Sequence, residues 1–231
     1  MERVMALPDT HWPWAHKDAV AWVYSRVEIF KPTVIIQLGD LYDQFSQSRF
    51  ARTHNLMTPS MEMIEARQGA EAMWKNLHKK APKATLLQIL GNHDDRAEKR
   101  ILEKAPELAH LIEEQLNGLY SFPKVQTNMD TAKEIEIDGV FYIHGHLTGS
   151  QNGAHARYFD RPVVHGHTHQ GSLWMSTMHN KLIWELDCGF LADQTAVPMK
   201  YGATRRNKWV LGYGEITSEG PAFKPYPGKK S

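Results

Sequence analysis

Short apolar segments that end in Asp, His or Asn recur along this chain, and they constrain its fold more than any other feature. The segments are residues 4–7, 33–38 and 84–90, and they lead into Asp9 and His11, into Asp40, and into Asn92. Alternation of such strands with helical patterns predicts parallel strands in an open α/β sheet. Because these sheets place their sites outside the carboxyl ends of the strands, we expect the polar residues to meet at one edge.

The expected helices are recognised by the spacing of their apolar residues and by their ends. Apolar residues recur at helical spacing over 17–30, and Pro32 stops this helix. A second helix is expected over 60–80, with Ser60 as its N-cap and with Met61 and Met63 in the core.

A third helical region follows the segment 84–90. It covers 96–117, and we expect two pieces because Pro106 interrupts the pattern. Asp94 and Asp95 precede it and are interpreted as its cap and first-turn acids, which stabilise the positive end of a helix. This interpretation gives them no role in catalysis.

The second half of the chain changes to strand patterns. Residues 134–144 alternate around Asp138-Gly139, which predicts a hairpin. A second hairpin is expected from 173–178 and 181–186, and a late strand from 209–217. No repeat or low-complexity segment is visible.

Composition fits one domain and excludes several classes of protein. A chain of 231 residues with 42% hydrophobic content buries a sizeable core, so we expect a single domain over 1–220 and a flexible tail over 221–231. The net charge of +1 gives no global footprint for nucleic acid. The only cysteine, Cys188, is expected to be a buried, inert thiol. Without a signal peptide or a membrane-length apolar run, a soluble cytoplasmic protein is expected.

Five motifs in a fixed order supply the pieces of a two-metal site. They are Asp9-x-His11, Gly39-Asp40-x-x-Asp43, Gly91-Asn92-His93-Asp94, Ile143-His144-Gly145-His146 and Gly166-His167-x-His169. Two divalent ions need one bridging carboxylate and a set of oxygen and nitrogen ligands. Asp40 suits the bridge, with Asp9, His11 and His169 on one ion and Asn92, His144 and His167 on the other. Neutral Asn and His ligands leave a net positive charge, which attracts a phosphate.

These motifs resemble the calcineurin-like metallophosphoesterase superfamily over residues 3 to about 191. The resemblance implies two facing mixed β-sheets flanked by helices, a four-layer α/β/β/α sandwich. It implies a dinuclear site with the ligands just named, and it selects His144 over His146. It also places His93 beside the scissile bond as a histidine that is not a ligand, with Asp43 orienting its ring. The residues themselves favour His93 as the general acid, because a leaving alkoxide needs a proton.

The end of the second motif bears on the substrate. Phosphoprotein phosphatases of this superfamily typically carry Asp-Arg-Gly there, whereas this chain has Asp43-Gln44-Phe45. The missing arginine removes a bidentate phosphate clamp. The pattern therefore looks more like the phosphodiesterase and DNA-repair nuclease branches.

Several residues near the motifs are candidate substrate contacts. Trp12 and Trp14 offer stacking surface for bases, and the polar candidates are Arg49, Arg52, His146 and Arg157. The alternative is that the tryptophans pack in the core and the arginines are solvated. His165, like His146, either lines the pocket or is only a neighbour of the ligands.

The sequence therefore predicts a dinuclear metal-dependent phosphoesterase, a phosphodiesterase or nuclease that uses a metal-bridging hydroxide and His93 as general acid. Manganese is expected, with iron or zinc as alternatives, since the ligands include no thiolate. The expected partner is a phosphodiester of DNA or a nucleotide. One alternative is hydrolysis of a small phosphomonoester or nucleotide, and another is a silent metal-binding module, which would not need His93.

Overall fold

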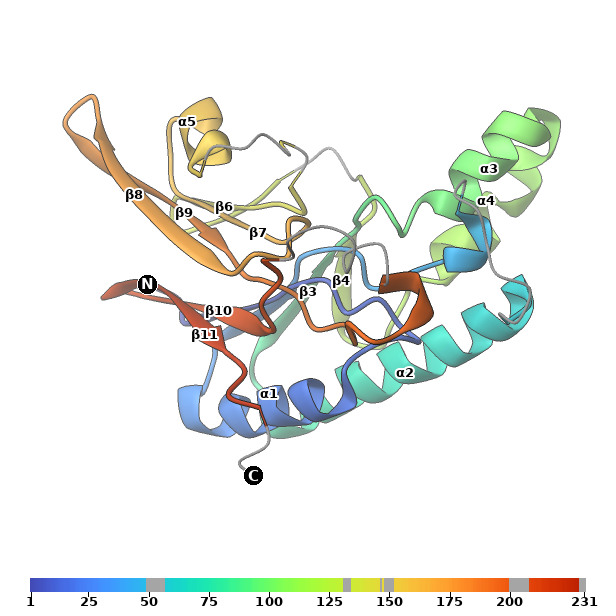
Figure 1. The fold of residues 1–231 in the computed structure, drawn as a ribbon, viewed down its shortest axis with the longest axis horizontal. Coiled ribbons are helices and arrows are strands. Elements are labelled where there is room, and N and C mark those ends of the chain that lie inside the picture. Colours follow the sequence, from blue (N-terminus) through green and yellow to red (C-terminus); the bar gives the residue numbers. More distant parts are fainter. Residues whose placement is uncertain (49–56, 131–133, 146, 148–151, 200–207, 229–231) are drawn as a thin grey trace.

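The structure is a computed structural model that describes residues 1–48, 57–130, 134–145, 147, 152–199 and 208–228 (Figure 1). Among these residues, the strands form one sheet of six strands and one of five. Both sheets contain parallel and antiparallel pairs. The sheets face each other, with helices outside them, so the predicted pair of mixed sheets flanked by helices is confirmed.

The first sheet is built on parallel strands. These are β1 (Val4–Leu7), β2 (Val34–Gln37), β3 (Thr85–Ile89) and β4 (Val125–Asn128). Two antiparallel strands, β10 (Gly212–Thr217) and β11 (Gly220–Pro225), complete the order β11-β10-β1-β2-β3-β4. The three predicted parallel strands are confirmed. The sequence pattern missed β4, an edge strand of only four residues, three of which are polar: Gln126, Thr127 and Asn128.

Alternating residues of the first sheet enter different cores. Met5 and Ile35 pack with the outer helices α1 (Lys17–Phe30) and α2 (Pro59–Lys80). Ala6 and Ile36 pack toward the second sheet. Because both faces of the sheet are covered, its strands β1, β2 and β3 are mostly apolar and do not alternate. Figure 1 shows α1 and α2 below this sheet, on the face away from the second sheet.

Helix α2 begins earlier than predicted. Thr58 is the N-cap, and its side chain accepts a hydrogen bond from the Met61 backbone N–H, so the assignment of Ser60 as the cap was wrong. Proline at the first helical position fits this start, because its missing N–H is not needed there. Met61 is 53% exposed, which corrects its expected place in the core, whereas Met63 packs against the core as predicted.

The second sheet contains the two predicted hairpins. Its strands are β5 (Ile135–Ile137), β6 (Val140–Tyr142), β7 (Val163–His165), β8 (Ser172–Met178) and β9 (Lys181–Asp187), in the order β5-β6-β7-β9-β8. Helix α5 (Ala154–Phe159) connects β6 to β7 and packs through Ala156 on the outer face of this sheet. Cys188 is fully buried between the sheets, and burial raises the pKa of its thiol, as expected for an inert cysteine.

The helical region after β3 is divided as predicted. Helix α3 (Arg96–Lys104) ends before the single turn η2 (Pro106–Leu108), and α4 (Ala109–Gly118) follows. A further short turn, η1 (Phe45–Gln47), follows β2. Within the described residues, no helix has both the length and the apolar composition needed to cross a membrane.

The predicted tail begins with an ordered strand. Residues 220–225 form β11, which pairs along its whole length with β10, so the expectation of a flexible segment from 221 was wrong as far as Pro225. Phe223 explains the order, because its ring packs against the inter-sheet core. Prolines at 221 and 225 are compatible with a strand at the sheet edge, where one row of N–H groups needs no partner.

Candidate metal centre

Loops from both sheets meet at one edge of the molecule. The loops after β1, β2 and β3 carry Asp9 and His11, Asp40 and Asp43, and Asn92 and His93, and the loops after β6 and β7 carry His144, His167 and His169. The contacts among these side chains bring all the predicted metal ligands together. The strand pattern had placed only the first-sheet loops at a common edge, while the motifs had assigned the later histidines to the same site. The structure shows that the loops after β6 and β7 bring these histidines there.

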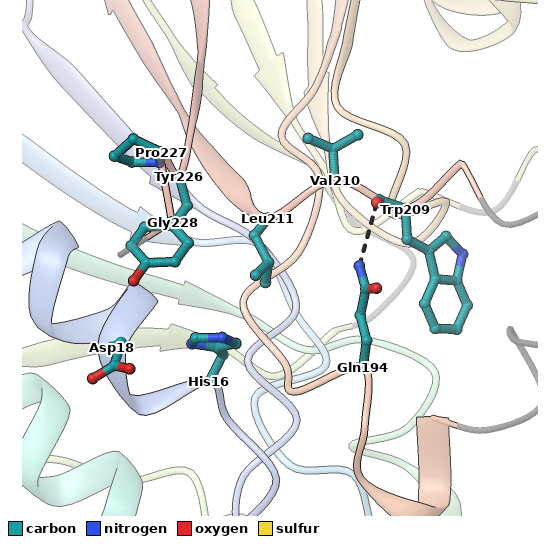
Figure 2. A pocket seen from close by; sticks show the side chains of 9 residues that line it. All are labelled: His16, Asp18, Gln194, Trp209, Val210, Leu211, Tyr226, Pro227 and Gly228. Atoms are coloured by element: carbon teal, nitrogen blue, oxygen red, sulfur yellow. Dashed lines mark hydrogen bonds between the residues drawn. The ribbon is translucent and has the colours of Figure 1, made fainter. Parts of the chain in front are cut away.

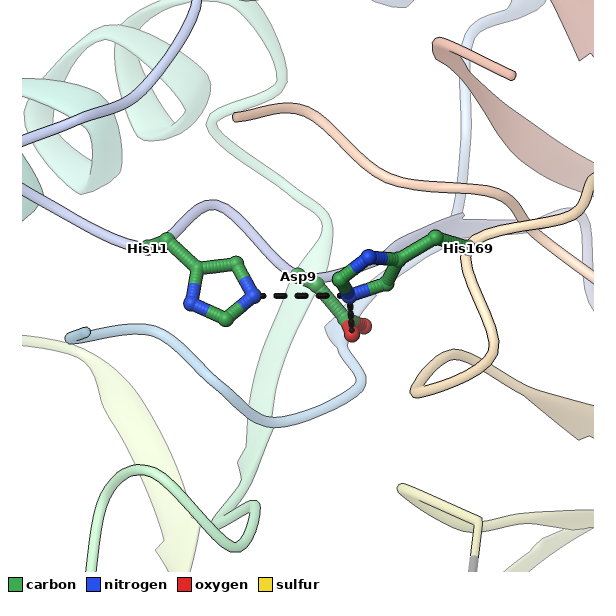
Figure 3. A group of neighbouring side chains, drawn as sticks. All are labelled: Asp9, His11 and His169. Carbon is green, nitrogen blue, oxygen red and sulfur yellow. Dashed lines mark hydrogen bonds and ion pairs between the residues drawn. The ribbon is translucent and has the colours of Figure 1, made fainter. Parts of the chain in front are cut away.

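One group of ligands consists of Asp9, His11 and His169 (Figure 3). His169 Nε2 lies 2.8 Å from Asp9 Oδ2 and 3.4 Å from His11 Nε2. On its other side, His11 Nδ1 lies 2.9 Å from Asp43 Oδ1, to which it donates its proton. A neutral imidazole has one N–H, so His11 Nε2 presents a lone pair to the other two side chains.

A second group consists of Asn92, His144 and His167. His144 Nε2 lies 2.9 Å from Asn92 Oδ1 and 3.1 Å from His167 Nδ1. His144 Nδ1 donates to the Leu38 carbonyl at 3.0 Å. This bond fixes the imidazole in the orientation in which Nε2 faces the group, a common arrangement for a histidine that binds metal.

Asp40 lies between the two groups. Its Oδ1 is 3.4 Å from His144 Nε2, and its Oδ2 is 3.9 Å from His11 Nε2. One oxygen of this carboxylate therefore faces each group. A carboxylate with this orientation can bridge two ions, which is the role that the sequence predicts for Asp40.

The backbone at four of these ligands is held in an unfavourable conformation. His11, Asp40, His167 and His169 have φ angles of 49°, 51°, 64° and 62°. Left-handed backbone costs a non-glycine residue about 1–3 kcal/mol and concentrates at functional sites. The surrounding structure maintains this conformation at each ligand, which aims the side chains inward.

Two glycines of the motifs are required by the close approach of carboxylates. A Cβ on Gly91 would lie 2.2 Å from Asp40 Oδ1, and a Cβ on Gly166 would lie 2.1 Å from Asp9 Oδ1. Both separations are far below van der Waals contact. The motif glycines therefore leave room for the two carboxylates.

Charges within the centre shift several pKa values. Burial alone would raise the pKa of Asp9, but His169 and His144 outweigh burial and lower it to about 2. Burial likewise opposes ionisation of Asp40, yet His144 and His93 hold the pKa of this carboxyl well below its usual range. Burial and then His144 lower the pKa of His167 to about 4, so its imidazole is neutral at pH 7 and keeps a lone pair.

His144 shows that the centre carries excess negative charge. Burial opposes protonation of this imidazole, but the carboxylates of Asp40 and Asp9 outweigh it and raise the pKa of His144 to about 10. In the protein alone, a proton thus balances part of the carboxylate charge. A bound cation would do the same and would take up the Nε2 lone pair in place of the proton.

The donor set fits two divalent ions. Two nitrogens bound tetrahedrally at about 2.1 Å from one ion are about 3.4 Å apart, which is the His11–His169 separation. Imidazole, carboxylate and amide ligands without a thiolate suit manganese, iron or zinc.

Asp43 and Arg96 hold the ring of His93. His93 Nδ1 lies 2.9 Å from Asp43 Oδ1, the same oxygen that accepts from His11. The Arg96 Nη2 donates to His93 Nε2 at 2.8 Å, and Nη1 donates to the Asp43 carbonyl at 2.8 Å. Burial opposes ionisation of Asp43, but bonds from His11 and His93 lower the pKa of its carboxyl. Asp43 therefore makes the contact that an orienting residue would need, and its role stays a prediction, whereas Arg96 was not anticipated.

Asp94 is a buried anchor rather than a helix cap. Its carboxylate accepts from the backbone N–H groups of Leu41, Tyr42 and Gly91, so it ties the loop after β2 to the loop after β3. Burial and then Asp40 raise its pKa to about 7. Asp95 occupies the N-cap position of α3, but its side chain makes no capping bond. The expected capping bonds are therefore absent, because the Asp94 carboxylate bonds to Leu41, Tyr42 and Gly91 and the Asp95 carboxylate pairs with Lys99.

The predicted substrate contacts have varied positions. Trp12 packs against the outer core, with its ring directly over Gly69 of α2, which supports the packing alternative for this residue. Trp14 is half-buried and lines a cavity of about 530 Å³. Arg157 lies on α5, with its guanidinium 4.8 Å from the centre of the Trp174 ring. The remaining candidates, Arg49, Arg52 and His146, lie outside the described residues.

A second buried histidine cluster lies beside the centre. Glu185 accepts from the backbone N–H groups of Gly153 and Ala156, and its oxygens lie 3.6 Å from His155 Nδ1 and 3.4 Å from His165 Nε2. His165 Nδ1 donates to the Gly166 carbonyl, and His155 Nε2 accepts from the Leu147 N–H. His165 is thus a neighbour of the metal ligands that contacts Glu185.

A pocket adjoins the first ligand group. Its volume is about 580 Å³, and its lining includes His16, Gln194, Trp209 and Tyr226 (Figure 2). Gln194 donates to the Trp209 carbonyl at 3.3 Å. The Trp209 ring also meets the His169 ring, with their centres 4.7 Å apart. Trp209 therefore connects the pocket wall with a predicted metal ligand.

Comparison with known proteins identifies the family. The model of the calcineurin-like phosphoesterase family matches residues 2–209, and this chain belongs to that family. It is 24% identical over 242 residues to the Gene 54 protein of Mycobacterium phage D29, a match that covers 97% of this chain and 92% of the phage protein. The Gene 54 protein of Mycobacterium phage L5 is 23% identical over 237 residues, with the same coverage.

Solved structures include a similar chain in YfcE, a phosphoesterase from E. coli. Its sequence identity is 16% and its TM-score 0.47, and the match covers 94% of this chain and 88% of the E. coli protein. Membership of the family makes this protein a candidate phosphoester hydrolase whose family chemistry agrees with its clusters of histidine and aspartate.

Proposed function

We propose that this protein is a dinuclear metal-dependent phosphodiesterase that acts on nucleic acid or a nucleotide. The observation that carries the proposal is the position of Asp40, whose two oxygens face two separate groups of ligands. A binding module with one structural ion would need only one such group. Manganese is the metal that we propose, with iron and zinc as alternatives, because the donors are nitrogen and oxygen.

When bound, the ions would polarise phosphoryl oxygens and activate water for attack on phosphorus. The protein's own residues supply the remaining functions. Asp43 holds the His93 ring by accepting from Nδ1, so Nε2 is the atom that would take up a proton from water and then pass it to the leaving oxygen. Asp43 also holds His11 in the same way, and one carboxylate thereby orients both a ligand and the acid.

Gln44 supports a diester as substrate. It stands where the phosphoprotein phosphatases have arginine, and its side chain is buried. Its amide donates to the Asp94 carbonyl and the Tyr120 hydroxyl and accepts from the Ala97 N–H. Through these bonds Gln44 fastens the loop after β2 to α3. Its amide is therefore not available to bind a third free phosphate oxygen, as an arginine at this position would.

A phosphomonoester is the second candidate substrate, and Arg96 is the observation that favours it. Its guanidinium lies at His93, although it comes from α3 and not from the second motif. An arginine there can bind a non-bridging phosphate oxygen, of which a monoester carries three and a diester two, and the monoester has the larger negative charge.

The test is turnover of an aryl phosphodiester and of the matching monoester by the manganese-loaded protein. We expect higher kcat/KM for the diester and competition by single-stranded DNA that weakens steeply with added salt. The Asp40→Asn variant measures any contaminating hydrolase. A clear preference for the monoester without DNA competition would favour the second candidate. No turnover of either ester above the variant would contradict the proposed enzyme.

A further inference from the structure

Arg96 is placed where an anionic substrate would approach His93. It is the first residue of α3, and its side chain is 19% exposed. One guanidinium nitrogen donates to the Asp43 carbonyl, and the other donates to His93 Nε2, each at 2.8 Å. The arginine therefore covers the ring nitrogen that Asp43 leaves available.

The two atoms that accept hydrogen bonds from this guanidinium are weaker acceptors than the carboxylates and phosphates that arginine usually binds. Carboxylates and phosphates bind arginine through charge-assisted, often paired hydrogen bonds, whereas an imidazole and a carbonyl are neutral acceptors. The Asp43 Oδ1 atom is 3.9 Å from Arg96 Nη1, and this oxygen already accepts from His11 and His93. A phosphate oxygen would be a better partner for Nη2 than the imidazole is.

The rigid attachment of Arg96 also points to a ligand. The carbonyl of Asp43 anchors Nη1, and the start of α3 fixes the backbone, while Gln44 ties the same loop to Ala97. Only the Nη2 contact is made to a side chain of the proposed chemistry, whereas Nη1 bonds to a backbone carbonyl. A small shift of Nη2 would replace His93 Nε2 by a phosphate oxygen as its acceptor, while the bond from Nη1 to the Asp43 carbonyl stays in place.

We propose that Arg96 binds a non-bridging phosphoryl oxygen of the substrate and of the phosphate product, an inference that rests on the proposed function. Nη2 leaves His93 Nε2 for the phosphate oxygen, while Nη1 stays on the Asp43 carbonyl. The exchange has two effects. It adds a charge-assisted bond to the phosphate, and it frees His93 Nε2 to take up a proton from water, which this nitrogen then gives to the leaving oxygen.

The alternative is that Arg96 only fastens the loop after β2 to α3. In that case its removal would lower stability and would leave phosphate binding unchanged once the protein is folded. Binding of inorganic phosphate to the manganese-loaded full chain separates the two roles, because this measurement needs no turnover.

The experiment compares Arg96→Gln, Arg96→Lys and the control Arg100→Gln by calorimetric titration with inorganic phosphate. Arg100 lies one turn further along α3 and is exposed, so the control removes the same charge from the same helix. Loss of a charge-assisted bond predicts phosphate binding weaker by about 10- to 100-fold in Arg96→Gln. We expect an intermediate loss in Arg96→Lys, which keeps the charge without the fork, and wild-type affinity in the control. KM should rise in the same order.

The outcomes distinguish the inference from the proposed function. If the wild type turns over a phosphoester and Arg96→Gln binds phosphate within twofold of it, the role of Arg96 is wrong and the proposed function stands. If the manganese-loaded wild type neither turns over esters nor binds phosphate, the proposed function fails, and the inference fails with it. Thermal melting shows whether each variant is folded, and Arg96→Lys gives the answer if Arg96→Gln is not.

Discussion

Two buried clusters of histidine and carboxylate lie side by side along the second sheet, and they differ in what their ring nitrogens contact. In the predicted metal centre, His11 and His144 each donate from Nδ1 to a protein acceptor and turn Nε2 toward other lone pairs. In the neighbouring cluster, Glu185 lies between the rings of His155 and His165. The residue types are nearly the same in both.

The difference lies in how the two clusters balance charge. Glu185 accepts two backbone N–H groups and lies opposite two imidazoles, so the protein itself supplies donors to both of its oxygens. The other centre directs ring nitrogens of four histidines and two carboxylates at shared points, and this convergence of acceptors favours the binding of cations. His155, His165 and Glu185 are also close enough together to hold an ion, but on this comparison we expect cations to bind the first cluster and not the second.

The sharpest test of this comparison removes one carboxylate from each cluster. Asp40→Asn replaces one bridging oxygen by an NH₂ group that cannot bind a cation. We expect bound manganese to fall from two ions to one or fewer by elemental analysis, and turnover to fall by on the order of 10³-fold or more. Glu185→Gln is the matched control and should keep both ions. Equal metal loss in the two variants would remove the distinction between the clusters.

A smaller effect is expected when the centre keeps its ligands and loses the predicted acid. His93→Ala should bind both ions and lose about 10²–10⁴-fold in turnover. The loss should be larger for an alkyl leaving group than for p-nitrophenol, which leaves without a proton. The test measures the bound metal and the turnover rates of the variant on the alkyl ester and on the p-nitrophenyl ester. Wild-type rates on the poor leaving group would show that His93 is not the acid.

The smallest effect concerns stability and belongs to the second cluster. Glu185→Gln should cost about 1.5–3 kcal/mol of unfolding free energy at pH 7, because charged hydrogen bonds are lost in a buried position. Chemical denaturation of both proteins measures the difference.

We also expect the difference in unfolding free energy between the wild type and Glu185→Gln to depend on pH. Burial opposes ionisation of Glu185, but His155 and His165 outweigh burial and lower its pKa from the ordinary 4.5. A lowered pKa contributes stability that is present above the unfolded value and is lost as the pH falls through the folded one. The wild-type advantage over Glu185→Gln should therefore shrink below about pH 4.5. An advantage that stayed constant with pH would mean that the charge of Glu185 does not stabilise the fold.

Local patterns predicted much of the fold. The apolar runs that form β1, β2 and β3 are buried on both faces. A run of apolar residues was therefore enough to predict each of these strands. Turn residues at Asp138-Gly139 and His179-Asn180 likewise marked both hairpins. Strand β11 was missed because its prolines and glycine have the composition of a loop, whereas its pairing with β10 and the contact of Phe223 with the inter-sheet core order it.

The sequence by itself determined the residue types of the centre, their order, and the strand ends from which the first-sheet loops arise. Only the tertiary structure decided that Trp12 packs on α2, that Asp94 joins two loops, and that Arg96 covers His93. The physical reason is the range of the interactions. Helix and strand patterns reflect neighbours a few positions apart, whereas these contacts join separate elements whose approach depends on how the sheets and helices pack.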